Sequence, residues 1–338
     1  METILGRLAA GEDLSMQEMA SAIDRVMRGE VSEGQIGLLL TSLRLKGETV
    51  DEVAGAAAAM RGHMRRIESQ RQGVIDTCGT GGDGASTFNI STAAALVAAA
   101  AGVPVAKHGN RRVTSKSGSA DVLARLGVNI EADLSCVSGC LDELGICFCF
   151  APLWHQAMKH VAPVRAKLGV PTIFNLLGPL ANPAGADYQL LGVARPELRG
   201  LLSAALARLG TRRALVVRGD DGLDEVTLAG PTRVTEVSQG HTREFAWTPA
   251  DFGLEPAELT PLKVAGPDES AAIIQQVLSG QPGPARDIVV ANAAAALWTA
   301  GHCDTLPGCA AMAADAIDSG AARELLARLV ERTRAAAA

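Results

Sequence analysis

The chain has 338 residues, of which 48% are hydrophobic, 20% are charged and only 3% are aromatic. This balance is typical of a globular protein with one large or two unequal domains. The formal net charge of -6 and the few aromatic side chains argue against nucleic-acid binding and membrane-surface binding. Seven cysteines, an odd number, fit reduced thiols, and no signal peptide is visible, so we expect a cytoplasmic protein.

The first part of the chain predicts a small all-helical domain over residues 1–70. Capping boxes, in which Ser or Thr precedes Glu or Gln by three positions, mark helix starts at Ser15, Ser32 and Thr49. Apolar residues follow each box at helical spacing, and short glycine breaks indicate antiparallel neighbours. We interpret these apolar stripes as core or as a subunit interface, without a catalytic constellation.

From residue 71 the pattern changes to alternating strands and helices, which is typical of a large α/β domain with a mostly parallel central sheet. Strands are predicted at residues 74–77, 103–106, 146–150, 189–193, 214–217, 225–228 and 233–236. Helices are predicted at 93–101, 120–126, 135–144 and 197–209, and C-terminal helices at 269–278, 287–300, 309–318 and 321–334.

A glycine-rich loop, Asp76-Thr-Cys-Gly-Thr-Gly-Gly-Asp83, lies between the first predicted strand and the next helix. Its glycines let the backbone approach a ligand closely, and unpaired N–H groups at a helix N-terminus favour a phosphate. Hydroxyl and amide side chains between Ser86 and Thr92 add hydrogen-bonding groups at the same end. We interpret this loop as a phosphate cradle; the alternative is a plain glycine-rich turn.

The same glycines match the dinucleotide-binding pattern Gly-x-Gly-x-x-Gly at 79–84. That pattern requires an acidic residue about 20 positions later, which holds a ribose hydroxyl. Lys107 stands in that region and no acid does, which suits a second phosphate better. The loop also lacks the Gly-Lys-Ser/Thr ending of a P-loop.

Two further clusters carry chemistry. Lys107-His-Gly-Asn-Arg-Arg112 follows the second predicted strand, and ligands of open α/β sheets bind at the carboxyl ends of strands. The basic loop and the glycine loop are therefore predicted to form one anion pocket, with a solvated basic turn as the alternative. The adjacent carboxylates of Asp224 and Glu225 suit Mg²⁺, although acidic turns are common.

Five motifs in order resemble the anthranilate phosphoribosyltransferase family: Gly79-Thr-Gly-Gly-Asp83, Lys107-His-Gly-Asn-Arg111, Ser117-Gly-Ser-Ala-Asp121, Thr172-Ile-Phe-Asn-Leu-Leu-Gly-Pro-Leu180 and Asp221-Gly-Leu-Asp-Glu225. The resemblance covers nearly the whole chain. It implies the class II nucleoside phosphorylase fold, in which residues 1–70 form the helical domain, joined by a returning segment near 165–185. The rest of 71–338 would form the α/β domain that binds the phosphoribosyl donor. It also implies a homodimer formed through the helical domain.

The activity implied by the resemblance is transfer of the phosphoribosyl group of phosphoribosyl pyrophosphate (PRPP) to anthranilate. The products are N-(5-phosphoribosyl)anthranilate and pyrophosphate, in tryptophan biosynthesis. The family uses Mg²⁺, and we expect two ions per active site. The chemistry needs positioning of a neutral aromatic amine more than a strong base, so no obligatory base is assigned.

Site residues are carried over from the family position by position. PRPP would bind to Gly79, Gly82, Asp83, Thr87, Asn89, Ile90, Ser91, Thr92, Lys107, His108, Gly109, Asn110, Arg111, Ser115 and Ser119. Anthranilate would contact Gly79, Asn110 and Arg165, where Arg165 offers a bidentate partner for the carboxylate. Ser91 would hold one Mg²⁺, and Asp224 with Glu225 the other.

The chain departs from the family pattern at Arg112, Thr114, Pro171 and Arg218. Arginine is usual at the Pro171 position and histidine is frequent at the Arg218 position, yet no proposed ligand is removed. Two other functions stay open: a pyrimidine nucleoside phosphorylase of the same fold, and a non-catalytic relative that binds a polyanion or nucleic acid. The Asp224–Glu225 pair and the 107–111 motif count against the phosphorylase, and the net charge of -6 against the binding role.

Overall fold

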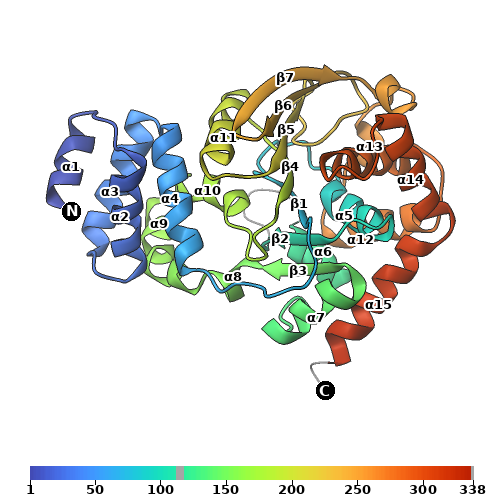
Figure 1. Cartoon of the computed structure of the whole chain (residues 1–338), viewed down its shortest axis with the longest axis horizontal. Helices are drawn as coiled ribbons and strands as arrows, with labels where there is room; N and C mark the ends of the chain where they lie inside the picture. Colours follow the sequence, from blue (N-terminus) through green and yellow to red (C-terminus); the bar gives the residue numbers. More distant parts are fainter. Residues whose placement is uncertain (112–117, 336–338) are drawn as a thin grey trace.

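The computed structural model of the chain describes residues 1–111 and 118–335. Four helices gather at one end of the molecule, drawn in blue in Figure 1, and they are α1 (Glu2–Ala9), α2 (Met16–Met27), α3 (Glu33–Lys46) and α4 (Val50–His63). The predicted capping boxes at Ser15, Ser32 and Thr49 are confirmed, since each hydroxyl accepts the backbone N–H of the third helical residue. The predicted N-terminal helical domain is thereby confirmed.

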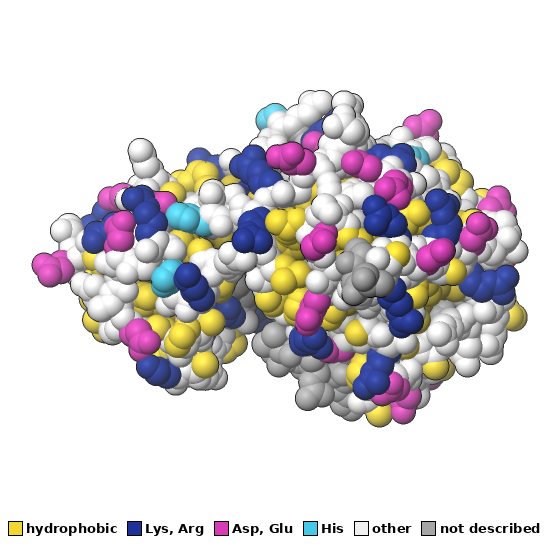
Figure 2. All heavy atoms as spheres, turned by 90° about the horizontal axis from the view of Figure 1, so that it is seen from below, with side chains coloured by type: hydrophobic (Ala, Val, Ile, Leu, Met, Phe, Trp, Pro, Cys, Tyr) yellow, Lys and Arg dark blue, Asp and Glu magenta, His cyan; other side chains and the backbone are white. Residues whose placement is uncertain are grey.

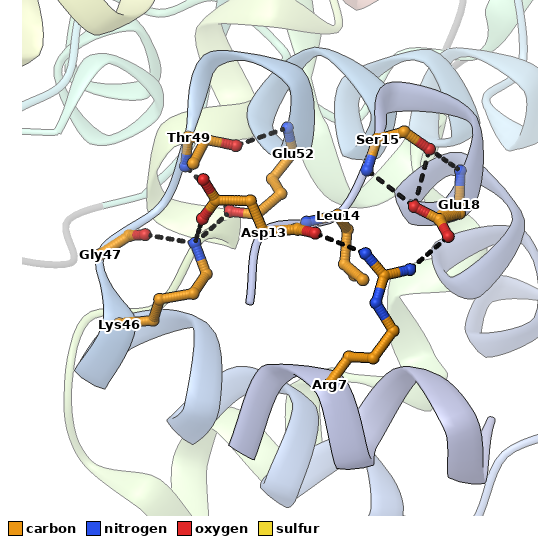
Figure 3. Close-up of polar contacts among 9 residues, drawn as sticks. All are labelled: Arg7, Asp13, Leu14, Ser15, Glu18, Lys46, Gly47, Thr49 and Glu52. Atoms are coloured by element: carbon orange, nitrogen blue, oxygen red, sulfur yellow. Dashed lines mark hydrogen bonds and ion pairs between the residues drawn. The ribbon is translucent and has the colours of Figure 1, made fainter. Parts of the chain in front are cut away.

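One buried carboxylate joins these helices. Glu52 is fully buried, and its side chain accepts hydrogen bonds from the Leu14 amide (3.0 Å), the Thr49 amide (2.9 Å) and the Lys46 ammonium (3.0 Å). Figure 3 shows these contacts converging from the start of α2, the end of α3 and the start of α4. The carboxylate thus replaces its lost hydration with partners from three separate elements.

The segment that follows the third strand leads back to the helical end. It contains α8 (Ala151–Trp154), η1 (Gln156–His160), α9 (Ala162–Leu168), α10 (Phe174–Leu177) and η2 (Gly178–Leu180). Helix α9 packs on α3, and α10 packs on α4. Figure 2 shows a hollow between the resulting small lobe and the larger one.

The larger lobe is built on a seven-stranded sheet of described residues, in the order β3-β2-β1-β4-β5-β6-β7. Strands β1 to β5 run parallel, and β6 and β7 are antiparallel additions at one edge. The strands are β1 (Ile75–Gly79), β2 (Val105–Gly109), β3 (Ile146–Phe150), β4 (Tyr188–Gly192), β5 (Arg213–Gly219), β6 (Thr232–Ser238) and β7 (His241–Trp247). The predicted mostly parallel sheet is confirmed.

Two strand predictions need correction. Residues 225–228 form no strand, because side chains of other segments satisfy their amides: Val226 donates to Asn292 and Thr227 donates to Thr232. The edge strand β7 was not predicted. Its residues before Trp247 are mostly exposed and polar, so the apolar alternation that marks a strand is missing.

Helices cover both faces of the sheet (Figure 1). On one face α5 (Ile90–Ala100) and α13 (Pro284–Thr299) pack together, with α12 (Pro267–Leu278), α14 (Leu306–Asp318) and α15 (Ala321–Ala335) around them. Helix α6 (Ser119–Arg125) packs on α12, and α7 (Leu134–Leu144) on β3 and α15. Helix α11 (Pro196–Arg208) covers β5 and β6 from the other face and contacts α4. Two short 3₁₀ turns, η3 (Pro249–Phe252) and η4 (Thr260–Leu262), complete the lobe.

Alternate residues of the strands enter two different cores. Leu190 and Leu215 join the core under α5 and α13, whereas Leu191 and Val216 join the core that continues into the helical lobe. Because successive side chains of a strand point to opposite faces, one face of the sheet packs under α5 and α13 and the other face packs in the core that continues into the helical lobe. This shared core packs the helical lobe against one face of the sheet.

The cysteine prediction is wrong in part. Cys303 and Cys309 form a disulfide, with Cα atoms 5.9 Å apart, because the turn before α14 folds back onto the first turn of that helix. Cys78, Cys136, Cys140, Cys147 and Cys149 are free. No helix in the described ranges is long and apolar enough to cross a membrane.

Candidate active site

A cavity of about 390 Å³ opens at the carboxyl ends of β1 and β2. Strand β1 lies at the point where the chain order turns, with β2 on one side and β4 on the other. Ligands of open α/β sheets bind at such a point. Three groups of described residues line the cavity: Cys78 to Ser91 with gaps, residues 107–111 with Gly118 and Ser119, and the pair Asp224 and Glu225. The structure thus brings together the three clusters that the sequence singled out.

The glycine loop turns sharply between β1 and α5. Gly81 and Gly82 have φ values of 66° and 85°, which residues with a side chain rarely adopt. Helix α5 begins at Ile90, three residues earlier than predicted, because the Asn89 side chain caps it by accepting the Thr92 amide at 3.0 Å. The helix therefore starts at the cavity wall, where its positive end favours an anion.

The acidic pair lies against this loop. The Gly81 amide donates to Asp224 Oδ2 at 3.0 Å, which joins the acidic turn to the glycine turn. Burial, and next the charge of Asp83, raises the pKa of Asp224 to about 7. Burial and the charge of Asp224 raise the pKa of Glu225 well above its usual value, against the opposing effect of Lys107. Ionised carboxylates crowded in this way are stabilised by a cation.

These residues fit Mg²⁺ as a metal that is shared with a substrate. In the part of the chain that the structure describes, no group of three or more His, Cys, Asp or Glu side chains could hold a metal by itself. Mg²⁺ uses one or two carboxylates, keeps several waters and binds substrate phosphates. Two carboxylates and the hydroxyl of Ser91, which also accepts from Lys107 at 3.0 Å, match that requirement.

Lys107 and His108 are buried at the end of β2. The Lys107 ammonium donates to the Thr77 carbonyl at 2.6 Å, and burial lowers its pKa although Asp76, Cys78 and Glu225 oppose this effect. His108 Nδ1 lies 3.0 Å from the Gly178 carbonyl, and its Nε2 lies 3.2 Å from Nε2 of His155. Burial lowers the pKa of His108 to about 3 and that of His155 to about 4, so both rings are neutral at pH 7.

Most of the other predicted PRPP residues also line the cavity. They are Gly79, Asp83, Thr87, Asn89, Ile90, Ser91, Gly109, Asn110, Arg111 and Ser119. Gly109 has no substitute, because a Cβ there would lie 2.1 Å from Ser119 Oγ. Arg111 is exposed and directs its guanidinium to Glu131 at 3.1 Å.

Three predicted residues that the structure describes are not among those that line the cavity. Gly82 belongs to the glycine loop but is not part of the wall, and Thr92 is buried in the first turn of α5. Arg165 lies on α9, where its guanidinium is 3.2 Å from Asn175 Oδ1 and 5.8 Å from the ring centre of Phe174. Ser115, with the divergent Arg112 and Thr114, lies outside the described residues.

Several cavity residues are absent from the set of site residues that was carried over from the family. They are Cys78, Thr80, Gly81, Gly84, Ser86, Phe88 and Gly118. All of them stand inside or next to the two loops that were selected, so the complete loops were a better predictor than the motif positions alone. Gly192 was also missed: it pairs with Gly79 across β4 and β1, and only the register shows this.

Comparison with known proteins supplies an independent result. Residues 2–64 match the model of the glycosyl transferase family, helical bundle domain, and residues 71–323 match that of the glycosyl transferase family, a/b domain. An anthranilate phosphoribosyltransferase of Rhodopirellula baltica is 53% identical over 95% of this chain and 94% of its own length.

Solved structures agree with this likeness. The anthranilate phosphoribosyltransferase of Thermus thermophilus superimposes with a TM-score of 0.92 at 46% identity, covering 98% of this chain and 99% of that one. The Saccharomyces cerevisiae enzyme in complex with PRPP and Mg gives a TM-score of 0.89 at 30% identity, covering 98% and 97%. The yeast enzyme has also been solved in complex with 4-fluoroanthranilate, with a TM-score of 0.86 at 28% identity over 99% of this chain and 98% of that one.

Proposed function

The chain belongs to the anthranilate phosphoribosyltransferase family of glycosyl transferases, and we propose that it transfers the phosphoribosyl group of PRPP to anthranilate. The products are N-(5-phosphoribosyl)anthranilate and pyrophosphate, and the reaction belongs to tryptophan biosynthesis. One observation carries the assignment: the glycine loop, the basic loop and the Asp224–Glu225 pair meet in a single cavity. A polyanionic donor needs all three groups at once.

The cavity residues have distinct roles towards PRPP. The glycine loop and the start of α5 bind phosphate oxygens through backbone N–H groups, and the hydroxyls of Thr87 and Ser91 add donors. Asp224 and Glu225 would hold one Mg²⁺ and Ser91 another, and such ions would supply positive charge near the pyrophosphate leaving group. Lys107 fixes the Ser91 hydroxyl and supplies a positive charge beside the acidic pair.

In the reaction the amine nitrogen of anthranilate bonds to C1 of the ribose, while the bond from C1 to the pyrophosphate oxygen breaks. The amine loses one proton, which passes to the departing pyrophosphate or to solvent water. His108 does not serve as an available base, because its Nδ1 faces the Gly178 carbonyl and its Nε2 faces His155. Catalysis therefore relies on the positioning of anthranilate: Asn110 orients the amine and Arg165 binds the carboxylate. Arg165 reaches the acceptor if the hollow between the lobes closes around it.

Further features belong to this proposal. Two Mg²⁺ ions bind per active site, one at Ser91 and one at Asp224 and Glu225. The domains are residues 1–70 with the returning segment 165–185, and the remainder of 71–338; the packing of α9 on α3 and α10 on α4 supports this division. The cytoplasmic location stays a prediction from the sequence.

A homodimer forms through the helical domain. Helix α3 supports it, because Leu38 and Leu45 are 60% and 83% exposed there and, at a spacing of seven residues, lie on one face of the helix. A dimer interface on this face would remove both side chains from water.

The assignment is tested by identifying the product. The protein is incubated with PRPP, anthranilate and Mg²⁺, and mass spectrometry is used to look for phosphoribosylanthranilate with an equal amount of pyrophosphate. A parallel incubation with thymidine or uridine and inorganic phosphate tests the phosphorylase alternative. Phosphorolysis without product from PRPP would overturn the proposal.

A further inference from the structure

A second cavity, of about 370 Å³, shares no lining residue with the active-site cavity. Its wall is formed by the end of α4, the linker to β1, the segment 179–187 and the turn before β5. Asp76 and Gln189, neighbours in the β1–β4 register, lie at its floor on the sheet face towards the helical lobe. Its volume lies within the usual range for sites of small organic molecules.

Three guanidinium groups border this second cavity without a carboxylate partner. Arg61, Arg66 and Arg212 form no ion pair with any residue that the structure describes. Arg61 donates its Nε to the Leu180 carbonyl at 2.6 Å, which leaves its forked terminal nitrogens for another acceptor. Burial and then the charge of Arg66 lower the pKa of Arg61, the response of a cation that has lost water and gained a like charge.

A buried carboxyl group faces the same cavity. Asp76 is fully buried; its Oδ1 accepts the His108 amide at 3.1 Å, and its Oδ2 has no hydrogen-bond partner among the described residues. The neighbouring amide of Asn182 donates to the Ala106 carbonyl at 2.7 Å. Burial raises the pKa of Asp76, while the Asn182 side chain, the charge of Lys107 and the His108 amide oppose this effect.

The carboxyl groups in the wall do not neutralise the three arginines. Asp187, the other carboxylate in the wall, accepts the Gly73 amide at 3.1 Å. Arg212 is held over the ring of Tyr188, with 5.2 Å between its guanidinium carbon and the ring centre. The cavity wall therefore has three cations, one hydrogen-bonded carboxylate and one fully buried carboxyl.

We propose that this second cavity is a binding site for a small organic anion, whose carboxylate or phosphate group is held by Arg61 and Arg212. A guanidinium recognises two oxygens of either group at once. Such an anion supplies acceptors for the terminal nitrogens of Arg61. The site is separate from the phosphoribosyl cavity and does not depend on the assignment of that cavity.

The test compares variants of the full chain by isothermal titration with two probes, inorganic phosphate and acetate, at constant ionic strength. The variants are Arg61→Gln, Arg212→Gln and, as a matched control, Arg65→Gln. Arg65 lies in the same linker and is exposed, but it is not part of the cavity wall, so its replacement removes the same charge. Phosphate that binds in the active site contributes equally to every variant.

The proposal predicts that at least one probe binds the wild type and Arg65→Gln alike, and on the order of tenfold more weakly to Arg61→Gln. Arg212→Gln gives the same direction of change and keeps the test valid if Arg61→Gln does not fold. Acetate and phosphate together show which head group the cavity prefers. Equal binding of both probes by all four proteins would overturn the proposal.

Discussion

Gly192 leaves room for Asp224: a Cβ on Gly192 would stand 1.6 Å from the Asp224 carbonyl oxygen, and a Cβ on Gly79 would stand 2.7 Å from Asp224 Oδ2. Gly79 and Gly192 are register partners at the ends of β1 and β4. Two bare backbone positions therefore let the acidic turn lie against the sheet edge where the glycine loop begins. The contact therefore requires glycine at both positions, and Gly192 stands in none of the five motifs.

Gly192→Ala is expected to displace the acidic turn and to lower kcat/KM on the order of 100-fold, since misplacement by about 1 Å has this effect. The measurement is the rate as a function of Mg²⁺ concentration, which should show a raised requirement for Mg²⁺. Gly200→Ala is the control, because a Cβ on Gly200 in α11 meets no atom within 4 Å. A Gly192→Ala protein with wild-type Mg²⁺ dependence would contradict this role.

Removal of both acidic charges tests the metal assignment. The double variant Asp224→Asn with Glu225→Gln keeps the size of both side chains and should lower Mg²⁺-dependent turnover by at least about 100-fold. Asp220→Asn is the control in the same turn, since Asp220 pairs with Arg233 at 2.8 Å and is exposed. Full activity of the double variant would refute the assignment of these two residues to the metal.

Arg165→Ala tests the acceptor side. We expect a higher KM for anthranilate and little change in the KM for PRPP, because Arg165 lies outside the PRPP cavity wall. Arg44→Ala is a suitable control: Arg44 also serves this region, by donating to the Pro171 carbonyl at 2.7 Å, but it has no proposed substrate contact. An unchanged anthranilate KM in Arg165→Ala would remove this residue from the role.

The buried histidine pair predicts a pH dependence of stability. Burial depresses the pKa values of His108 and His155 to about 3 and about 4, below the ordinary 6.5. Their neutral forms stabilise the fold fully above pH 6.5, and this contribution is lost as the pH falls from 6.5 towards 4. Replacing His155 with Gln should reduce the loss of unfolding free energy between pH 7 and pH 5 by roughly 1–2 kcal/mol.

Urea unfolding of the variants at the two pH values measures this effect. His241→Gln, at an exposed position on β7, provides the control and should keep the wild-type pH dependence. An identical loss of stability in His155→Gln and the wild type would show that the histidine pair does not cause the fall in unfolding free energy between pH 7 and pH 5.

Glu52 provides a stability test within the helical lobe (Figure 3). Glu52→Ala leaves the Leu14 and Thr49 amides and the Lys46 ammonium without their common acceptor, so we expect a loss on the order of 3–5 kcal/mol. The exposed pair of Glu33 and Lys167 is the comparison, and Glu33→Ala should cost less than about 1 kcal/mol. Thermal unfolding of both variants measures the difference, and equal effects would contradict the account of Glu52.

Local patterns predicted much of this molecule because they report local physics. The boxes at Ser15, Ser32 and Thr49 fix helix starts through contacts three residues apart, and each was found. The start of α5 was predicted three residues late, because Asn89 acts as a cap inside a run of polar residues that also suits a loop. The strand predicted at residues 225–228 is absent, because the Val226 amide donates to the side chain of Asn292, 66 positions away, and the Thr227 amide to that of Thr232.

The residues of the candidate site also fall into two groups, those that the local sequence predicts and those that only the fold brings together. Loops that carry their own chemistry, at Gly79 and at Lys107, were recognisable from their residues. The partnership of Gly192 with Asp224 and that of His108 with His155 depend on residues far apart in the chain, which only the register and the packing bring together. Arg165 shows the opposite case, since a motif position alone does not place a side chain in the cavity wall.

The most direct test of the central claim follows the fluorescence of anthranilate after the protein, PRPP and Mg²⁺ are combined. We predict a loss of fluorescence that requires both PRPP and Mg²⁺ and that the double variant of Asp224 and Glu225 fails to produce. Unchanged fluorescence in a folded preparation that still binds PRPP would contradict the claim that anthranilate is the acceptor.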